Sequence, residues 1–359
     1  MAMPKNVELI KVMNKINKKY GENTIINGEQ IIAAEGRMTT GSLAFDVALG
    51  GGWPVNQWNE IIGDESSGKS TIALKTIAAN QVKDPNFTVV WVAAEEWVPS
   101  YATMLGVDVS RIYVISSNSM EDVYQSVIDL AESKAIDCIV IDSLPALVHD
   151  SEDEKDMDEM TVGKNALLTN RFFRKVGVAT KRSLVEEERP FLGLMINQWR
   201  EKIGVTHGDN RTSPGGKGKN FAYFTRVDVK RSDWIEVGKG DNMVRVGQTI
   251  KVRLIKNKSA PPQQTAFMDF YFRDGGLIDK GQYDSAKEII AMGIINGVIK
   301  KGGGWYKYTL NGVERQWQGA NKVVDSIREE IDLREAIDRE VLDTIKAGSK
   351  FVAEEDDEN

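Results

Sequence analysis

The stretch Gly63-Asp-Glu-Ser-Ser-Gly68-Lys69-Ser70 decides the fold, because it matches the phosphate-loop pattern G-x-x-x-x-G-K-[ST]. Two glycines at this spacing let backbone N–H groups converge on phosphate oxygens at the positive end of the next helix. Lys69 can then reach the β- and γ-phosphates, and the Ser70 hydroxyl can ligate Mg²⁺. We therefore expect a site for ATP with Mg²⁺. The residues expected to contact the nucleotide are Gly63, Glu65, Ser66, Ser67, Gly68, Lys69, Ser70 and Thr71.

The segments on both sides of the phosphate loop fit this interpretation. Residues 58–62 predict a strand before the loop, and the apolar spacing of Ile72, Leu74 and Ile77 predicts a helix after it. A glycine-rich turn followed by an exposed lysine would need neither element. From residue 36 to about residue 276, short apolar strands alternate with helical patterns, which predicts an α/β fold with a parallel sheet.

Two further strands end in carboxylates. Residues 138–141 form an apolar strand that ends in Asp142, where a carboxylate beside the phosphate loop could hold the magnesium shell. Residues 88–93 form another strand, followed by Glu95 and Glu96, where a carboxylate could orient and deprotonate the attacking water. Taken alone, an aspartate can also cap a helix, and a glutamate pair can begin a helix in solvent.

The remaining chain divides into four predicted parts. They are 1–35, with an amphipathic helix over 6–19; an ATPase core over 36–276; a small α+β C-terminal domain over 277–349; and an acidic, disordered tail over 350–359. Within the core, the pattern after residue 222 predicts consecutive strands over 224–229, 244–246, 249–255 and 266–272. In the C-terminal domain it predicts helices over 285–292 and about 323–345.

Composition excludes several classes of protein. Of 359 residues, 41% are hydrophobic and 28% are charged, which is typical of a soluble globular protein. The longest apolar runs are too short to span a bilayer, and the first residues lack the apolar core of a secretory signal. One cysteine and two histidines leave neither an intrachain disulfide nor a ligand set for structural zinc. We expect a cytoplasmic protein that does not enter membranes.

Charge is distributed unevenly along the chain. The net charge is −7, yet the segment from Arg200 to Lys258 holds 14 lysines and arginines against 6 acidic residues, a balance of +8. Acidic residues gather instead at 150–159 and 354–358. A basic stretch within an acidic protein can form a surface for a polyanion, although ordinary solvated charges on hairpins give the same count.

Several motifs in order resemble those of RecA-family recombinases, which include bacterial RecA and phage-encoded RecA/UvsX proteins. The motifs are residues 40–50 (TGSLAFDVALG), the phosphate loop, Ala94-Glu95, Leu105-Gly-Val-Asp108, Val140-Ile-Asp-Ser143, Ile196-Asn-Gln198, Lys202-Ile-Gly-Val205 and Lys256-Asn-Lys258. The resemblance covers almost the whole chain. It implies a RecA-type P-loop core and a DNA-dependent ATPase that forms a helical filament on single-stranded DNA. It also implies pairing and strand exchange with homologous duplex DNA.

The resemblance also implies roles for residues around the nucleotide. Glu95 corresponds to the family's catalytic glutamate, with Glu96 a weaker candidate because of a one-residue gap nearby. Tyr101 corresponds to the aromatic side chain that packs on adenine, although by itself it could be a tyrosine on a helix surface. Gln198 corresponds to the glutamine that senses the γ-phosphate.

DNA and neighbouring subunits are implied to contact other segments. Residues 199–216 resemble the second DNA-binding loop, with contacts from Arg200, Lys202, His207, Arg211, Gly215 and Gly216. Lys256 and Lys258 correspond to lysines that act catalytically on the ATP of a neighbouring subunit, and Phe221 to an aromatic at the subunit contact. The N-terminal helix resembles a segment that docks on the adjacent subunit; docking within its own chain is the alternative. Residues 305–308 (WYKY) resemble the domain that gathers duplex DNA.

Three departures from the family pattern stand out. Residues 150–161, where a first DNA loop is expected, are unusually acidic; Val98 replaces an aspartate near adenine; and Asp64 replaces a proline. These departures favour a phage-encoded member. Two other functions share the core: a hexameric helicase, and a non-catalytic ATP-gated accessory protein. The Lys256-Asn-Lys258 pair in place of an arginine finger argues against the helicase, and the intact set of Lys69, Ser70, Glu95 and Asp142 argues against the accessory protein.

Overall fold

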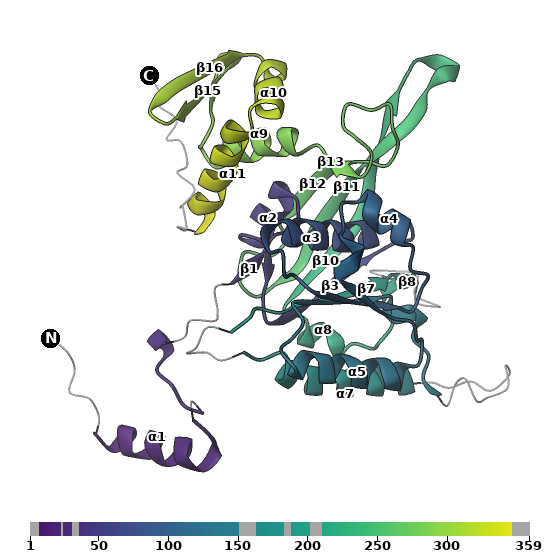
Figure 1. Ribbon diagram of the computed structural model, residues 1–359, viewed down its shortest axis with the longest axis vertical. Coiled ribbons are helices and arrows are strands. Elements are labelled where there is room, and N and C mark those ends of the chain that lie inside the picture. The colour runs from purple at the N-terminus through teal and green to yellow at the C-terminus, as the bar shows by residue number, and fades with distance from the viewer. Residues whose placement is uncertain are drawn as a thin grey trace.

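A nine-stranded mixed sheet with helices on both faces forms the centre of the computed structural model (Figure 1), which describes residues 7–22, 24–30, 36–150, 163–182, 188–201 and 210–346. Five adjacent strands run parallel to one another. In sheet order they are β3 (Gln57–Gly63), β7 (Leu192–Gln198), β6 (Cys138–Asp142), β4 (Val89–Ala93) and β5 (Ile112–Ile115). The carboxyl ends of β3, β7, β6 and β4 therefore meet at one edge, the place where parallel sheets bind ligands.

The other side of the sheet is antiparallel. Its first strand joins β3 in parallel, and each later strand reverses direction. These strands are β10 (Thr225–Val237), β11 (Val244–Asn257), β12 (Thr265–Tyr271) and β13 (Gln282–Tyr283). β10 and β11 form a long hairpin that projects beyond the helices in Figure 1. The change from alternating strands and helices to consecutive strands after residue 222 is thereby confirmed.

Two apolar cores lie on the two faces of the sheet. Helices α2 (Leu43–Leu49), α3 (Lys69–Lys83) and α4 (Pro99–Met104) cover one face, and the first core lies beneath them (Figure 1). On the other face α5 (Met120–Glu132) and α7 (Lys164–Ala179), together with the short α8 (Lys219–Ala222), enclose the second core. The predicted strands over 58–62, 88–93 and 138–141 are confirmed to within two residues.

Several predicted boundaries are wrong. The strand expected over 224–229 continues to Val237, and the helix expected over 285–292 continues to Ile295. The strands expected over 244–246 and 249–255 are one continuous strand, β11. Gly247, which falls between the two expected strands, lies within β11, where a glycine is needed because an added Cβ would lie 2.4 Å from the Phe270 carbonyl oxygen. The helix expected over 323–345 is instead two helices, α10 (Ala320–Glu329) and α11 (Ile331–Lys346), which separate at Glu330 because its backbone is extended.

The ends of the chain lie outside the two cores. Helix α1 (Val7–Tyr20) matches the predicted amphipathic helix, has no buried residue, and lies apart from the sheet in Figure 1. At the other end, α9 (Ser285–Ile295), α10 and α11 pack with a three-stranded sheet around a third core. Its strands are β14 (Lys300–Gly302), β15 (Trp305–Leu310) and β16 (Val313–Gln318). Strand β13 lies beyond Gly276 in sequence but forms the edge of the main sheet.

Candidate active site

The phosphate loop connects the end of β3 to the start of α3, as its sequence predicts. Gly63 must be glycine, because an added Cβ would lie 2.2 Å from the carbonyl oxygen of Val229. Gly68, the residue that caps α3, has φ 101°, a conformation that favours glycine. Ser67 Oγ is buried and has no hydrogen-bond partner within the described residues. A buried hydroxyl without a partner is costly, so a ligand that accepts its hydrogen bond fits this loop.

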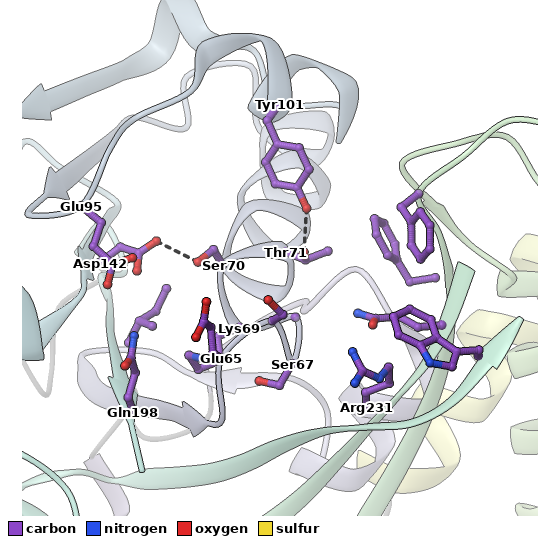
Figure 2. Close-up of a pocket in the computed structure, with 17 residues that line it drawn as sticks. Glu65, Ser67, Lys69, Ser70, Thr71, Glu95, Tyr101, Asp142, Gln198 and Arg231 are labelled. Atoms are coloured by element: carbon purple, nitrogen blue, oxygen red, sulfur yellow. Dashed lines mark hydrogen bonds between the residues drawn. The ribbon is translucent and has the colours of Figure 1, made fainter. Parts of the chain in front are cut away.

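A cavity of about 390 Å³ opens over the loop and gathers most of the predicted nucleotide residues. Figure 2 shows Lys69, Ser70, Glu95, Asp142 and Gln198 around it. Ser70 Oγ donates to Asp142 Oδ2 over 2.9 Å, which joins the two predicted magnesium ligands across two elements. The other residues that line the cavity are Glu65, Ser66, Ser67, Gly68, Thr71, Tyr101, Ile196, Arg231, Trp234, Gln248, Phe270 and Phe272.

The charges of this cavity are not balanced by their own surroundings. Burial, and then the nearby charge of Glu95, raise the pKa of Asp142 to about 6, against the hydrogen bond from Ser70. Burial also lowers the pKa of Lys69, although Asp142 and Glu95 oppose this shift. Lys69 Nζ donates to the Asp64 carbonyl oxygen over 2.6 Å rather than to a carboxylate. A bound polyphosphate with a divalent cation would compensate both groups.

Mg²⁺ fits the donor set at this point. Serine and aspartate oxygens are ligands that Mg²⁺ accepts, and it usually keeps waters and substrate phosphates as its other ligands. Within the described ranges, no group of three or more His, Cys, Asp or Glu residues could enclose a metal alone. A magnesium ion here would therefore be shared between Ser70, Asp142, the phosphates and water.

Glu95 and Glu96 differ in position. Glu95 lines the cavity, and its Oε1 accepts a hydrogen bond from Ser143 Oγ over 2.5 Å. Its backbone N–H donates to the Asp142 carbonyl oxygen over 3.1 Å. Both glutamates are exposed, but Glu96 is not among the residues that line the cavity. The geometry therefore favours Glu95 over Glu96 as the group that faces a γ-phosphate.

Tyr101 and Gln198 lie on two sides of the cavity. The hydroxyl groups of Tyr101 and Thr71 share a hydrogen bond of 2.9 Å, which brings the ring over the start of α3 (Figure 2). Gln198 ends β7, and its backbone N–H donates to Asn197 Oδ1 over 2.9 Å. An amide at this point can donate to a phosphate oxygen and can move when that phosphate leaves.

One wall of the cavity consists of residues that were not predicted from the sequence to lie near the nucleotide. Arg231, Trp234, Gln248, Phe270 and Phe272 come from β10, β11, β12 and the residue after β12. The Arg231 guanidinium lies 4.0 Å from the centroid of the Trp234 ring. No spacing in the sequence connects these residues to the phosphate loop, because the antiparallel half of the sheet brings them there.

The predicted DNA-binding residues fall partly outside the described chain. Lys202 and His207 lie outside it, as does most of the acidic stretch over 150–161. On the two sides of residues 202–209, Arg200 and Arg211 lie on β8 (Arg200–Glu201) and β9 (Arg211–Thr212), which pair as a short antiparallel ribbon. Arg211 lies 4.6 Å from the Trp199 ring centroid, and Trp199 Nε1 donates to Asp228 Oδ1 over 2.8 Å. The predicted glycines Gly215 and Gly216 have φ 86° and 75°.

The predicted interface residues surround α8 and not the cavity of their own chain. Lys256 Nζ donates to the carbonyl oxygens of Asn220 and Tyr223 over 2.7 and 2.6 Å. Burial, followed by the charges of Lys258 and Arg226, lowers the pKa of Lys256 to about 8. Phe221 is 81% exposed, which leaves its ring accessible. Neither Lys256 nor Lys258 is among the residues that line the nucleotide cavity.

A comparison with known families assigns the chain. The model of the RecA N-terminal domain matches residues 7–277. The chain belongs to the RecA family. Protein RecA of Thermus thermophilus is 36% identical over 362 residues, which cover 100% of this chain and 99% of that protein. Protein RecA of Lactococcus lactis subsp. cremoris is 34% identical over 328 residues, which cover 91% of this chain and 80% of that protein.

Family membership establishes the class of activity. The chain is a DNA recombinase of the RecA family and a DNA-dependent ATPase, with the predicted RecA-type α/β core. A third relative, Protein RecA of Chlorobaculum tepidum, is 36% identical over 92% of this chain. The helicase and accessory-protein alternatives are not favoured.

Among the described residues, no helix has the length and apolar character needed to cross a bilayer. The phage origin stays a prediction.

Proposed function

We propose that the chain polymerises on single-stranded DNA as a helical homo-oligomer. There it binds ATP with Mg²⁺, pairs the bound strand with homologous duplex DNA and exchanges strands in the cytoplasm of its host. One observation carries this proposal: the cavity over the phosphate loop brings Lys69, Ser70, Asp142, Glu95 and Gln198 together from four separate segments. The four parts defined from the sequence then serve as docking helix, ATPase core, duplex-gathering domain and acidic tail.

Binding of ATP follows from the loop geometry. Backbone N–H groups of the loop and the Ser67 hydroxyl donate to phosphate oxygens, while Lys69 leaves the Asp64 carbonyl for the β- and γ-phosphates. Ser70 and Asp142 would hold Mg²⁺, which neutralises phosphate charge when it is bound. The Tyr101 ring packs on the adenine base.

Hydrolysis follows from the carboxylate and the amide. The Glu95 carboxylate orients a water and accepts its proton as the water oxygen bonds to the γ-phosphorus. The bond from that phosphorus to the β–γ bridging oxygen breaks, and ADP and phosphate leave. Gln198 donates to the γ-phosphate and registers its departure.

Assembly brings further positive charge from a neighbouring subunit to the γ-phosphate. Lys256 and Lys258 lie away from their own cavity, beside the exposed ring of Phe221. Placed against a neighbouring subunit, they would reach its γ-phosphate and stabilise the charge that develops there. ATP turnover then depends on polymerisation, which DNA promotes through Arg200, Lys202, His207, Arg211, Gly215 and Gly216.

The decisive experiment measures ATP hydrolysis with and without single-stranded DNA, followed by joint-molecule formation with homologous duplex. We expect turnover to rise at least tenfold with DNA and joint molecules to require ATP, Mg²⁺ and homology. Turnover that ignores DNA, or joint molecules formed equally with a non-homologous duplex, would contradict the proposal.

A further inference from the structure

A lysine is completely buried between the DNA-loop segment and the strand that leads to the phosphate loop. Lys219 begins α8, and its side chain is 0% exposed. Its Nζ donates to Glu60 Oε1 over 3.0 Å, to Ser213 Oγ over 2.7 Å and to Asn220 Oδ1 over 3.1 Å. Lysine is almost never fully buried unless it is paired, so this placement needs an explanation.

The partner of Lys219 is also completely buried and has other donors. Glu60 lies in β3, three residues before Gly63, and is 0% exposed. It accepts from Asn197 Nδ2 over 2.8 Å and from Arg226 Nε over 2.6 Å, in addition to Lys219. We call Glu60, Asn197, Ser213, Lys219 and Arg226 the Glu60 cluster.

The two ends of the Glu60 cluster reach two functional segments. Ser213 directly follows β9, one of the two strands that hold the predicted DNA loop. Asn197 directly precedes Gln198 and accepts a hydrogen bond from its backbone N–H over 2.9 Å. A continuous path of hydrogen bonds therefore runs from Ser213 through Lys219, Glu60 and Asn197 to the residue that lines the nucleotide cavity.

Stability alone does not account for this arrangement. Apolar side chains of similar volume often replace a buried ion pair without loss of stability, so such pairs are weak evidence for a stabilising role. The Glu60 cluster also contains two cations, Lys219 and Arg226, against one carboxylate. Lys219 Nζ divides its donors among Glu60, Ser213 and Asn220, so a shift of Ser213 changes how strongly Glu60 is held.

We propose that Lys219 is a positioning residue that couples the DNA-loop segment to Gln198 through Glu60 and Asn197. The coupling rests on the proposed function, because it requires DNA on that segment and ATP in the cavity. DNA bound beside β8 and β9 sets the position of Ser213, and Lys219 transmits that position to β3 and β7. Gln198 then meets the γ-phosphate in the geometry that favours turnover.

The test replaces Lys219 with Met, which nearly keeps its volume and removes its charge. At saturating single-stranded DNA, we expect the ratio of stimulated to unstimulated turnover to fall about tenfold for Lys219→Met, less than the 10²–10³-fold cost of removing a transition-state donor outright, because Lys219 only positions Gln198. The DNA concentration for half-maximal stimulation should stay within about twofold of the parent protein, because Lys219 is buried and does not contact DNA. By linkage, an unchanged DNA affinity means that DNA changes the affinity for a non-hydrolysable ATP analogue equally in the parent and in the variant, so the loss is expected in turnover alone.

Two further variants make the test specific. Lys217→Met removes an exposed charge two residues away. It should raise the half-maximal DNA concentration without lowering the maximal ratio, the reverse of the result for Lys219→Met. Ser213→Ala removes only the loop end of the path and does not threaten folding; it should lower the ratio about threefold. Combined with Lys219→Met, it should cause no further loss.

The outcomes separate the two proposals. A parent protein that ignores DNA overturns the proposed function and the coupling with it. A stimulated parent with equally stimulated Lys219→Met and Ser213→Ala variants overturns the coupling alone. If Lys219→Met fails to fold, Ser213→Ala decides: an unchanged ratio overturns the path through Ser213, and a lowered ratio with an unchanged half-maximal DNA concentration supports it.

Discussion

Strand β3 serves two polar regions that differ in how their groups are satisfied. At its end, the nucleotide cavity holds a Ser67 hydroxyl that has no hydrogen-bond partner among the described residues, an Asp142 whose pKa is raised to about 6, and a Lys69 whose Nζ donates to a backbone carbonyl. Three residues before that end, Glu60 is fully buried and accepts hydrogen bonds from three side chains. The first region needs a ligand to compensate its polar groups, whereas the second is compensated within the chain.

This difference implies that the two regions contribute differently to activity and to the free energy of unfolding. Polar groups that are compensated only when a ligand binds contribute to ATP binding and turnover but little to folding, because the free protein does not compensate their charges. Groups that are compensated within the chain cost stability when one partner is removed, since the other charge is left buried. Substitutions in the nucleotide cavity should therefore lower turnover with little change in stability, whereas substitutions in the Glu60 cluster should lower stability in addition to the stimulation by DNA.

The largest effect is expected for Lys69→Ala in the nucleotide cavity. Loss of the cation that faces the β- and γ-phosphates should lower ATP turnover by at least about 10³-fold, the upper end for removal of one electrostatic stabiliser, and should weaken nucleotide binding as well. Steady-state hydrolysis and fluorescent-nucleotide titration measure both. Lys83→Ala, at the exposed last turn of the same helix, is the matched control and should retain turnover. A folded Lys69→Ala variant with normal turnover would contradict the phosphate-loop assignment.

The next largest effect is expected for Glu95→Gln. A glutamine keeps the shape but cannot accept a proton, so turnover should fall by about 10²- to 10⁴-fold while ATP binding and the DNA-bound filament persist. Single-turnover hydrolysis beside nucleotide affinity separates the two. Glu96→Gln controls for the loss of one charge at the same turn and should stay within about twofold of the parent. If Glu96→Gln stops turnover and Glu95→Gln does not, the role moves to Glu96.

Stability should show the reverse order between the two regions. Glu60→Gln leaves Lys219 and Arg226 without their carboxylate and should lower the free energy of unfolding by about 3–5 kcal/mol. Asp142→Asn in the nucleotide cavity should leave that free energy unchanged or raise it, because burial and the charge of Glu95 already disfavour its ionised form. Urea denaturation without nucleotide measures both variants. Equal decreases in the free energy of unfolding for Glu60→Gln and Asp142→Asn would contradict the difference in stability expected between the two regions.

The sequence predicts the nucleotide cavity well because its chemistry is local. The phosphate loop carries its glycines, lysine and serine within eight residues, and Asp142 and Glu95 follow apolar strands that are recognisable by themselves. Parallel strands bring their carboxyl ends to one edge, so three separate segments meet without any knowledge of side-chain packing. The same reasoning finds the parallel strands expected over 58–62, 88–93 and 138–141 to within two residues.

The Glu60 cluster is not predictable by the same route. Its members lie in β3, β7, β10, α8 and the segment after β9, and only the three-dimensional path of the chain brings them together. One signal was present: Glu60 follows Asn59 in a predicted strand that otherwise consists of Trp58, Ile61 and Ile62, and a carboxylate buried in such a strand must find a donor. Which donor it finds depends on Lys219, a residue in a basic loop that looks like a solvated charge. For the same reason, the sequence does not predict that Arg231 and Trp234 line the nucleotide cavity.

The smallest effect concerns another buried carboxylate, Glu288, for which the described part of the chain supplies no ion-pair partner. Ser42 Oγ and the Ala44 N–H donate to its Oε2 over 2.7 and 3.3 Å, and its Oε1 has no partner within the described residues. Burial, which outweighs these hydrogen bonds, raises the pKa of Glu288 to about 8, with a further contribution from Asp46.

Between pH 4.5 and 8 the folded chain then holds more protons at Glu288 than the unfolded chain, so stability falls as pH rises through this window. Glu288→Gln removes that proton, and its Tm should fall less between pH 6 and pH 8 than the parent's, by about 2–4 °C. Thermal unfolding at the two pH values measures the difference, with Glu329→Gln on the exposed side of α10 as the matched control. A parent whose Tm does not depend on pH in this range would show that neutral donors can hold a buried carboxylate ionised. The distinction between Glu60, which has two cations, and Glu288, which has none, would then fail.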